Sequence, residues 1–192
     1  MSGNKQIFYW DSNIYLAWLR NEQTYAEHLP YIQRIIEANF AGENTIITST
    51  ITLIEVLESQ LNDDQKKRFR KAFNQYHHLL LDVTDPIARQ ARKFREFYSS
   101  AEDGRRLLVP DAIHLATAHV YKVTEVHTFD DGRKKGYDEN HEKVKTVSLL
   151  SMNGNVALQN IKICKPFITM AKEDPTKTEN QSEGDLFSER AN

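Results

Sequence analysis

The sequence predicts an α/β domain built on a five-stranded, mostly parallel sheet that is flanked by helices. The spacing of apolar residues along the chain supports this prediction. Short apolar runs, typical of buried strands, alternate along the chain with longer segments whose apolar residues recur at helical spacing. Strands that alternate with helices in this way favour parallel pairing, because each helix returns the chain to the same end of the sheet.

The five expected strands are short and rich in β-branched and aromatic residues. They cover residues 5–11, 45–48, 79–83, 123–128 and 160–164. Helices are expected between them, over residues 14–20, 24–39, 50–59, 62–78 and 86–100, then from about Asp111, with a short last helix over 142–152. Pro86 favours a helix start at its position, whereas Pro30 is expected to break or kink the second helix.

Four acidic residues stand next to these predicted elements. Asp11 follows the first strand, Glu55 lies in the helix after the second strand, and Asp111 opens a helix. Asp130 follows the fourth strand, with Asp131 beside it. Because ligands gather at the carboxyl ends of parallel strands, we expect these carboxylates to converge on one cavity there. For Asp111 alone, an ordinary helix N-cap remains the alternative interpretation.

The motifs around these acids resemble those of PIN-domain ribonucleases, and in particular the VapC-type toxins of bacterial and archaeal toxin–antitoxin pairs. The resemblance is carried by four motifs: Asp11 after an N-terminal strand, Glu55 within Ser-Thr-Ile-Thr-Leu-Ile-Glu-Val, Asp111 within Pro-Asp-Ala-Ile-His-Leu-Ala-Thr-Ala, and Thr128-Phe129-Asp130. It implies a three-layer fold with strand order 3-2-1-4-5. We expect this domain to occupy residues 1–171 and to be followed by a disordered acidic tail, 172–192.

Crowded carboxylates repel one another, and a divalent cation relieves that repulsion. Oxygen ligands without a Cys or clustered His pattern favour Mg²⁺ or Mn²⁺ over structural zinc. The expected metal ligands are Asp11, Glu55, Asp111 and Asp130, with Asp131 as the substitute for Asp130. The resemblance implies that these residues are also catalytic, in the hydrolysis of RNA phosphodiester bonds by an endoribonuclease. It further implies a cognate antitoxin as partner, and leaves homo-oligomerisation open.

Several neighbouring residues have plainer interpretations. Ser12 and Thr128 are expected to hold the acids by hydrogen bonds or to act as caps. His114, on a partly apolar helix, is interpreted as a packed core residue. Cys164 is expected to be buried and inert. Tyr137 is expected to replace the aromatic residue that usually follows the fourth acid of the family, displaced by extra charged residues.

Composition narrows the class of protein. The chain has 192 residues, a net charge of −2 and one cysteine, so an internal disulfide is impossible and a reducing cytoplasm fits. We expect no signal peptide and no membrane span, because no apolar run is long enough. The segment 171–192 has three basic and six acidic residues, which leaves the remainder near +1. Basic runs at 66–71 and 89–95 are interpreted as solvated helix faces that a polyanionic substrate near the acids could use.

Two other functions remain open from the sequence. A small-molecule phosphatase that forms a phosphoaspartate would need a second Asp two residues after Asp11, where Asn13 stands. A PIN-like domain that has weak or no catalysis and serves as an RNA-binding or regulatory module would not need all four acids. Metal-dependent RNA cleavage that is lost when Asp11 is substituted would distinguish a nuclease from the phosphatase and from the non-catalytic module.

Overall fold

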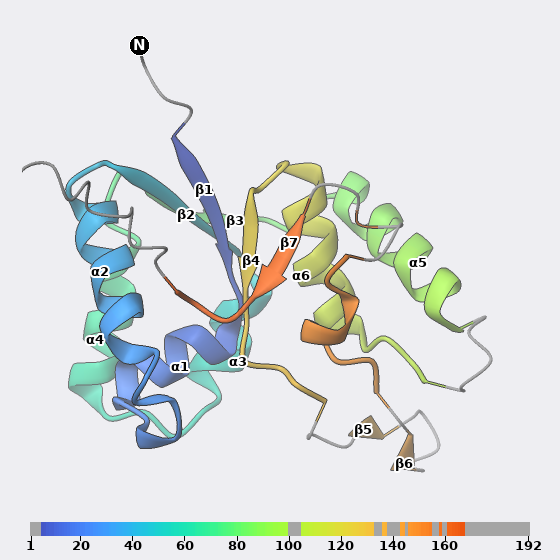
Figure 1. The fold of residues 1–192 in the computed structure, drawn as a ribbon, viewed down its shortest axis with the longest axis horizontal. Coiled ribbons are helices and arrows are strands. Elements are labelled where there is room, and N and C mark those ends of the chain that lie inside the picture. Colours follow the sequence, from blue (N-terminus) through green and yellow to red (C-terminus); the bar gives the residue numbers. More distant parts are fainter. Residues whose placement is uncertain are drawn as a thin grey trace, which may run out of the picture.

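The computed structural model has a central parallel sheet between two layers of helices (Figure 1). It describes residues 5–99, 105–132, 136–137, 143–144, 146–154, 158 and 161–167. The strands are β1(Gln6–Trp10), β2(Asn44–Ser49), β3(His78–Leu81), β4(Glu125–His127) and β7(Lys162–Cys164). Their order is β3-β2-β1-β4-β7, and all four pairings are parallel. The predicted five-stranded sheet and its order are therefore confirmed; the predicted acidic tail lies outside the described residues.

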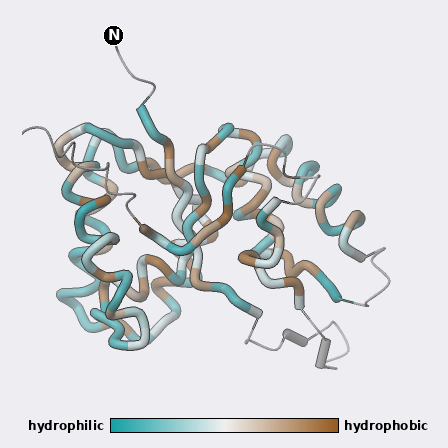
Figure 2. Tube along the Cα trace, in the orientation of Figure 1, coloured by the Kyte–Doolittle hydropathy of each residue, from teal (hydrophilic) through white to brown (hydrophobic). Residues whose placement is uncertain are grey.

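Alternating residues of β1 face the two helix layers. Tyr9 belongs to a buried cluster with residues of α5(Asp85–Ser99) and α6(Val109–Val120). Phe8 and Trp10 point to the opposite cluster, which the remaining four helices complete: α1(Ser12–Arg20), α2(Leu29–Phe40), α3(Ile51–Leu57) and α4(Asp63–Ala72). Apolar and polar residues alternate along the strands and around the helices (Figure 2). This alternation of strand faces makes the sheet the middle of three layers.

Two predicted helices have different bounds in the structure. The segment predicted as one helix over 24–39 forms a 3₁₀ turn, η1(Gln23–Tyr25), and then α2, with Pro30 in the first turn of α2. Proline is tolerated there because the first N–H groups of a helix have no partner within it. The helix predicted to reach His78 ends at Ala72, and His78 instead begins β3.

The predicted helix over 142–152 is wrong. The structure has a short antiparallel pair, β5(Gly136–Tyr137) with β6(Lys143–Val144), and then a 3₁₀ turn, η2(Leu150–Met152). Between them Thr146 forms a parallel bridge with Arg106. The bridge to Arg106 comes from a distant part of the chain, and together with the β5–β6 pairing it outweighs the helical spacing of the local apolar residues.

Within the described residues, no helix combines the length and apolarity needed to cross a bilayer.

Candidate active site

A pocket of about 550 Å³ opens at the carboxyl ends of β1 and β4. We call it the acidic pocket, because Asp11, Glu55, Asp111, Asp130 and Asp131 all line it. These residues come from four separate places: the end of β1, the body of α3, the first turn of α6 and the loop after β4. The structure thus brings together every acid that the sequence singled out.

Asp11 is buried and lies at the junction of β1 and α1. Its Oδ1 accepts a hydrogen bond from Ser12 Oγ at 3.0 Å. Its Oδ2 accepts from Asn13 Nδ2 at 2.5 Å and from Thr128 Oγ1 at 2.7 Å. Ser12 and Thr128 therefore hold Asp11 as expected, and this carboxylate has a fixed direction into the acidic pocket.

Asn13 has a role that the sequence did not indicate. Besides its bond to Asp11, its Nδ2 lies 3.1 Å from Thr128 Oγ1, and its Oδ1 accepts from Phe129 N at 2.9 Å. One amide thereby ties the start of α1 to the segment after β4. The position at which an aspartyl phosphatase would need a second acid is instead a neutral clamp, which disfavours the phosphatase alternative.

Asp111 is not the N-cap of its helix. Leu108 occupies the N-cap position of α6 in an extended conformation, Pro110 lies in the first turn, and Asp111 follows it. The raised pKa of Asp111, about 7, has burial as its main cause, followed by the negative charges of Asp11 and Asp130, with a smaller contribution from Glu55. This carboxylate therefore faces the other acids of the pocket, and a cation bound there would lower its pKa.

His114 is buried, as expected of a core residue, but it also contacts two of the acids. Its Nε2 lies 2.8 Å from Glu55 Oε2 and 3.5 Å from Asp11 Oδ1. Burial disfavours its charged form, yet the adjoining Tyr9 hydroxyl and the two carboxylates outweigh burial and hold the pKa of His114 well above 6.5. Its spacing, one helical turn after Asp111, was the only sign in the sequence that it could reach the pocket.

Asp130 and Asp131 differ in their surroundings, although both line the acidic pocket. Asp130 Oδ1 accepts from Gly132 N at 3.1 Å, and Oδ2 accepts from Leu149 N at 2.8 Å. Ser148 Oγ donates to the Asp130 carbonyl at 2.7 Å. Asp130 therefore joins the loop after β4 to the segment before η2, whereas Asp131 is exposed.

We expect Asp130→Asn to lower the free energy of unfolding by about 1–3 kcal/mol, because its amide nitrogen would face a backbone N–H donor. Asp82→Asn, an exposed change of the same chemistry after β3, should stay within about 0.5 kcal/mol of the wild type. Urea denaturation of both metal-free variants measures the difference. Equal stabilities would show that the two backbone hydrogen bonds of the Asp130 carboxylate add nothing to the fold.

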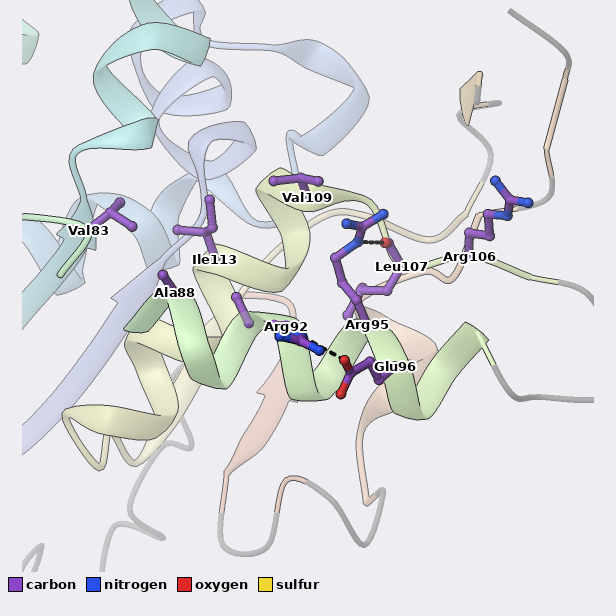
Figure 3. Close-up of a pocket in the computed structure, with 10 residues that line it drawn as sticks. Val83, Ala88, Arg92, Arg95, Glu96, Arg106, Leu107, Val109 and Ile113 are labelled. Carbon is purple, nitrogen blue, oxygen red and sulfur yellow. Dashed lines mark hydrogen bonds and ion pairs between the residues drawn. The ribbon is translucent and has the colours of Figure 1, made fainter. Parts of the chain in front are cut away.

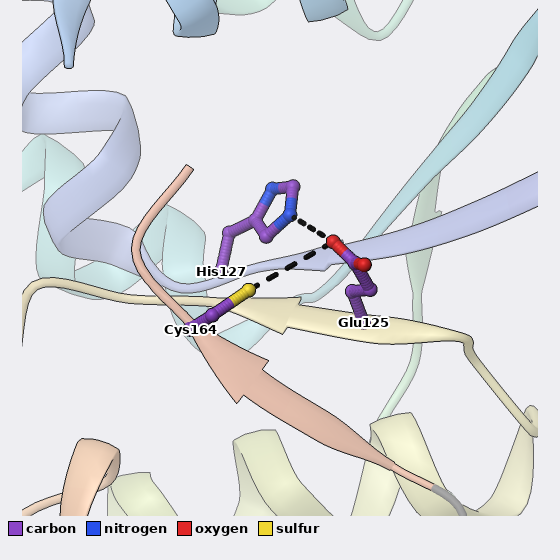
Figure 4. A group of neighbouring side chains, drawn as sticks. All are labelled: Glu125, His127 and Cys164. Atoms are coloured by element: carbon purple, nitrogen blue, oxygen red, sulfur yellow. Dashed lines mark hydrogen bonds and ion pairs between the residues drawn. The ribbon is translucent and has the colours of Figure 1, made fainter. Parts of the chain in front are cut away.

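A second group of metal-ligand residue types lies on β4 and β7, away from the acidic pocket (Figure 4). Glu125 Oε2 is 3.0 Å from His127 Nε2 and 3.8 Å from Cys164 Sγ. The His127 hydrogen bond, aided by Lys162, lowers the pKa of Glu125 to about 2. Burial, with the nearby Glu125 charge, raises the pKa of Cys164 to about 12. Cys164 is half-buried rather than fully buried, and its thiol stays protonated, which agrees with the predicted inert role.

A groove lined by arginines and apolar side chains adjoins the acidic pocket, and the first turn of α6 separates the two. Leu108 and Pro110 line the acidic pocket, whereas Val109 lines the groove between α5 and α6 (Figure 3). Arg106 and Arg95 lie along the groove, and Arg95 Nε donates to the Leu107 carbonyl at 3.2 Å. Positive side chains thus lie directly beside a negatively charged pocket.

The comparisons with known proteins agree with this fold. Residues 8–138 match the model of the PIN domain family, and the chain belongs to that family. The resemblance noted in the acidic motifs is therefore confirmed. A search of curated proteins gives no match.

Solved structures of toxin–antitoxin proteins are similar to this chain. VapBC2 from Rickettsia felis, bound to a promoter DNA fragment, has a TM-score of 0.50 and 16% identity over 64% of this chain and 87% of that one. VapC20 from Mycobacterium tuberculosis, a sarcin-ricin loop cleaving toxin, has a TM-score of 0.49 and 16% identity, and the match covers 65% of this chain and 90% of that one. A toxin–antitoxin complex from Klebsiella pneumoniae has a TM-score of 0.45 and 25% identity, and the match covers 65% of this chain and 85% of that one. At its level of identity, the similarity to VapBC2 concerns the fold.

Proposed function

We propose that this PIN-domain protein is a divalent-metal-dependent endoribonuclease and the toxin of a toxin–antitoxin pair. One observation carries the proposal: carboxylates from four separate segments line a single pocket at the carboxyl edge of the sheet. A fold that only needed stability would not gather them, because each buried charge without a counter-ion costs free energy.

The donor atoms of the acidic pocket fit Mg²⁺ or Mn²⁺. They are carboxylate oxygens, which hard divalent cations prefer. Burial and then the neighbouring acids raise the pKa of Asp111, and a bound cation would relieve the repulsion among these carboxylates. Asp11 and Asp111 would hold the cation, with Glu55 and Asp130 completing the set. When bound, a divalent cation supplies Lewis-acid charge at a phosphodiester.

The protein's own residues then position the reactants. Ser12, Asn13 and Thr128 hold the Asp11 carboxylate so that its direction is set before the substrate arrives. Tyr25 lines the acidic pocket and stacks on the buried Phe129 ring, with ring centroids 3.8 Å apart, and offers an apolar wall for an unpaired base.

The decisive experiment is cleavage of single-stranded RNA by purified protein with Mg²⁺ or Mn²⁺, with EDTA, and with metal restored. We expect internal cleavage that EDTA stops and either metal rescues. Asp85→Asn, which changes an exposed acid on α5, is the matched control for substitutions of the pocket acids Asp11 and Asp111 and should cleave normally. RNA that stays intact under all metal conditions would favour the non-catalytic RNA-binding alternative, whereas release of phosphate from small phosphoesters would favour the phosphatase.

The toxin assignment needs a separate test. We expect expression to arrest growth of a bacterial host, and co-expression of a small protein encoded beside this one to relieve the arrest. This expectation places the protein in the cytoplasm, where RNA and an antitoxin would be available. Growth unaffected by a soluble, RNA-cleaving protein would leave a nuclease that is not a toxin.

The groove between α5 and α6 gives a prediction about RNA affinity. We expect Arg106→Gln to weaken RNA binding and to reduce the slope of log affinity against log salt by about 0.7 for each RNA phosphate that is no longer neutralised. Arg89→Gln is the control on the same helix layer, because Arg89 is paired with Asp85 at 2.7 Å. Binding is measured with EDTA present, so that cleavage does not interfere. An unchanged salt slope in Arg106→Gln would place the RNA path elsewhere.

A further inference from the structure

His114 connects the sheet to the acidic pocket through both of its ring nitrogens. Nδ1 lies 2.6 Å from Tyr9 Oη, and Nε2 lies 2.8 Å from Glu55 Oε2. Tyr9 Oη in turn accepts a hydrogen bond from Ser49 N at 3.1 Å. The Tyr9 oxygen can accept from Ser49 N and still donate its hydroxyl proton to Nδ1. An ionised carboxylate only accepts, so the hydrogen-bond pattern assigns a proton to Nε2.

The proton on Nε2 is present whether His114 is neutral or charged. In the neutral ring, Tyr9 donates to Nδ1 and Nε2 keeps the proton; in the charged ring, both nitrogens carry one. Either way Nε2–H points at Glu55, with Asp11 Oδ1 at 3.5 Å as a second acceptor. A protonated nitrogen has no lone pair for a metal. In this arrangement the Nε2–H is directed at Glu55, so we assign His114 as a hydrogen-bond donor to the carboxylate, although its position beside Asp11 and Glu55 has the geometry of a metal group.

The opposite face of β1 carries the same arrangement without the acidic pocket. His127 is fully buried, its Nδ1 accepts from Trp10 Nε1 at 3.1 Å, and its Nε2 lies 3.0 Å from Glu125 Oε2. Indole N–H can only donate, so the proton of His127 is on Nε2 and is directed at Glu125. Tyr9 and Trp10, adjacent residues of β1, thus each contact Nδ1 of a histidine, and of these two histidines only His114 contacts an acid of the pocket.

We propose that His114 is a positioning residue that fixes the Glu55 carboxylate for cation binding. Glu55 is half-buried on the surface helix α3, and a glutamate in that setting has several rotamers. The Nε2–H bond selects one rotamer that points toward Asp11, so less side-chain freedom is lost when the cation arrives. The consequence for RNA cleavage rests on the proposed nuclease function, whereas the ring state and the metal affinity do not.

Mn²⁺ titration by calorimetry, with no RNA present, tests this role. We expect His114→Asn to weaken Mn²⁺ binding by about 10–100-fold, the range typical of residues that orient metal ligands. Asparagine can still contact Tyr9 but is too short to reach Glu55. His114→Gln, whose amide extends to the position of Nε2, should recover most of the affinity. His127→Asn, equally buried but facing Glu125, should bind Mn²⁺ like the wild type and controls for general destabilisation.

The results that would contradict the role of His114 differ from the result that would contradict the nuclease function. Wild-type affinity in His114→Asn, or an equal loss in the Asn and Gln variants, would show that the donated hydrogen bond does not position Glu55. No saturable Mn²⁺ binding by the wild type would also overturn the inference. Normal Mn²⁺ binding without RNA cleavage would remove the proposed nuclease function and leave the role of His114 standing.

The ring state itself can be read in the folded wild-type protein without metal, which avoids any variant that fails to fold. Nitrogen-15 chemical shifts and ring couplings of labelled histidine should report a proton on Nε2 of His114. Tyr9→Phe, which removes the hydroxyl at Nδ1, should change the ring signals of His114 and leave those of His127 unchanged. A His114 ring with its proton on Nδ1 alone would overturn the proposal.

Discussion

Asp111→Asn is expected to abolish RNA cleavage and at the same time to stabilise the metal-free protein near pH 7. The charge of Asp111 is disfavoured in the fold, because burial and the neighbouring acids raise its pKa from 3.8 to about 7. Asparagine resembles the protonated form and carries no such penalty. Allowing for partial solvent exposure of the site, we expect a gain of about 1–3 kcal/mol at pH 7. Loss of a metal-binding charge should cost cleavage at least about 10²-fold.

The pH dependence follows from the raised pKa. The unfolded chain releases the Asp111 proton near pH 3.8, whereas the fold keeps it to about pH 7. The stability that this proton contributes is therefore complete below the unfolded pKa and is lost as the pH rises through 7. Urea denaturation in EDTA at several pH values should show the advantage of Asp111→Asn growing over this window. A variant that is folded, no more stable than wild type and still active would make Asp111 an ordinary surface acid.

Asp11→Asn should also abolish cleavage, but it should lower stability. The Asp11 carboxylate is buried and receives hydrogen bonds from Ser12, Asn13 and Thr128. An amide nitrogen placed among these donors would leave at least one of them unsatisfied. We expect a loss of about 2–4 kcal/mol in the free energy of unfolding.

The control for Asp11→Asn is Ser12→Ala, which keeps the carboxylate and removes one donor to Oδ1. It should retain measurable cleavage and lose about 1 kcal/mol or less. Denaturation and single-turnover cleavage are measured on the same preparations. If Asp11→Asn were as stable as wild type, the three donors would not be holding a charge.

Together the two substitutions test how the acidic pocket is built. Both remove one negative charge, yet one should stabilise and the other destabilise the metal-free protein. The difference arises because Asp11 is surrounded by donors, whereas Asp111 faces other acids. If both variants changed the free energy of unfolding in the same direction, Asp11 would not be stabilised by its donors while Asp111 is destabilised by the other acids.

Local patterns in the chain were enough to predict the parallel sheet and the edge at which the four acids meet. Apolar runs alternating with helical spacing favour parallel strands, and parallel strands place Asp11 and Asp130 at one edge of the sheet. The start of the helix that contains Asp111 could also be predicted, because proline favours the first turn of a helix and Pro110 directly precedes Asp111. Such features depend on residues close together in the chain, which is why the sequence alone was sufficient.

The surroundings of those acids depend instead on how distant elements pack. His114 meets Tyr9, 105 residues away, and Glu55, 59 residues away. Residues 142–152 lose their predicted helix because Asp130 and Arg106 bind parts of that segment. The spacing of residues within one segment cannot predict such partners, because a hydrogen bond between distant residues forms only when whole helices and strands pack together. The same sequence pattern is therefore compatible with an inert core histidine and with one that orients a carboxylate in the acidic pocket.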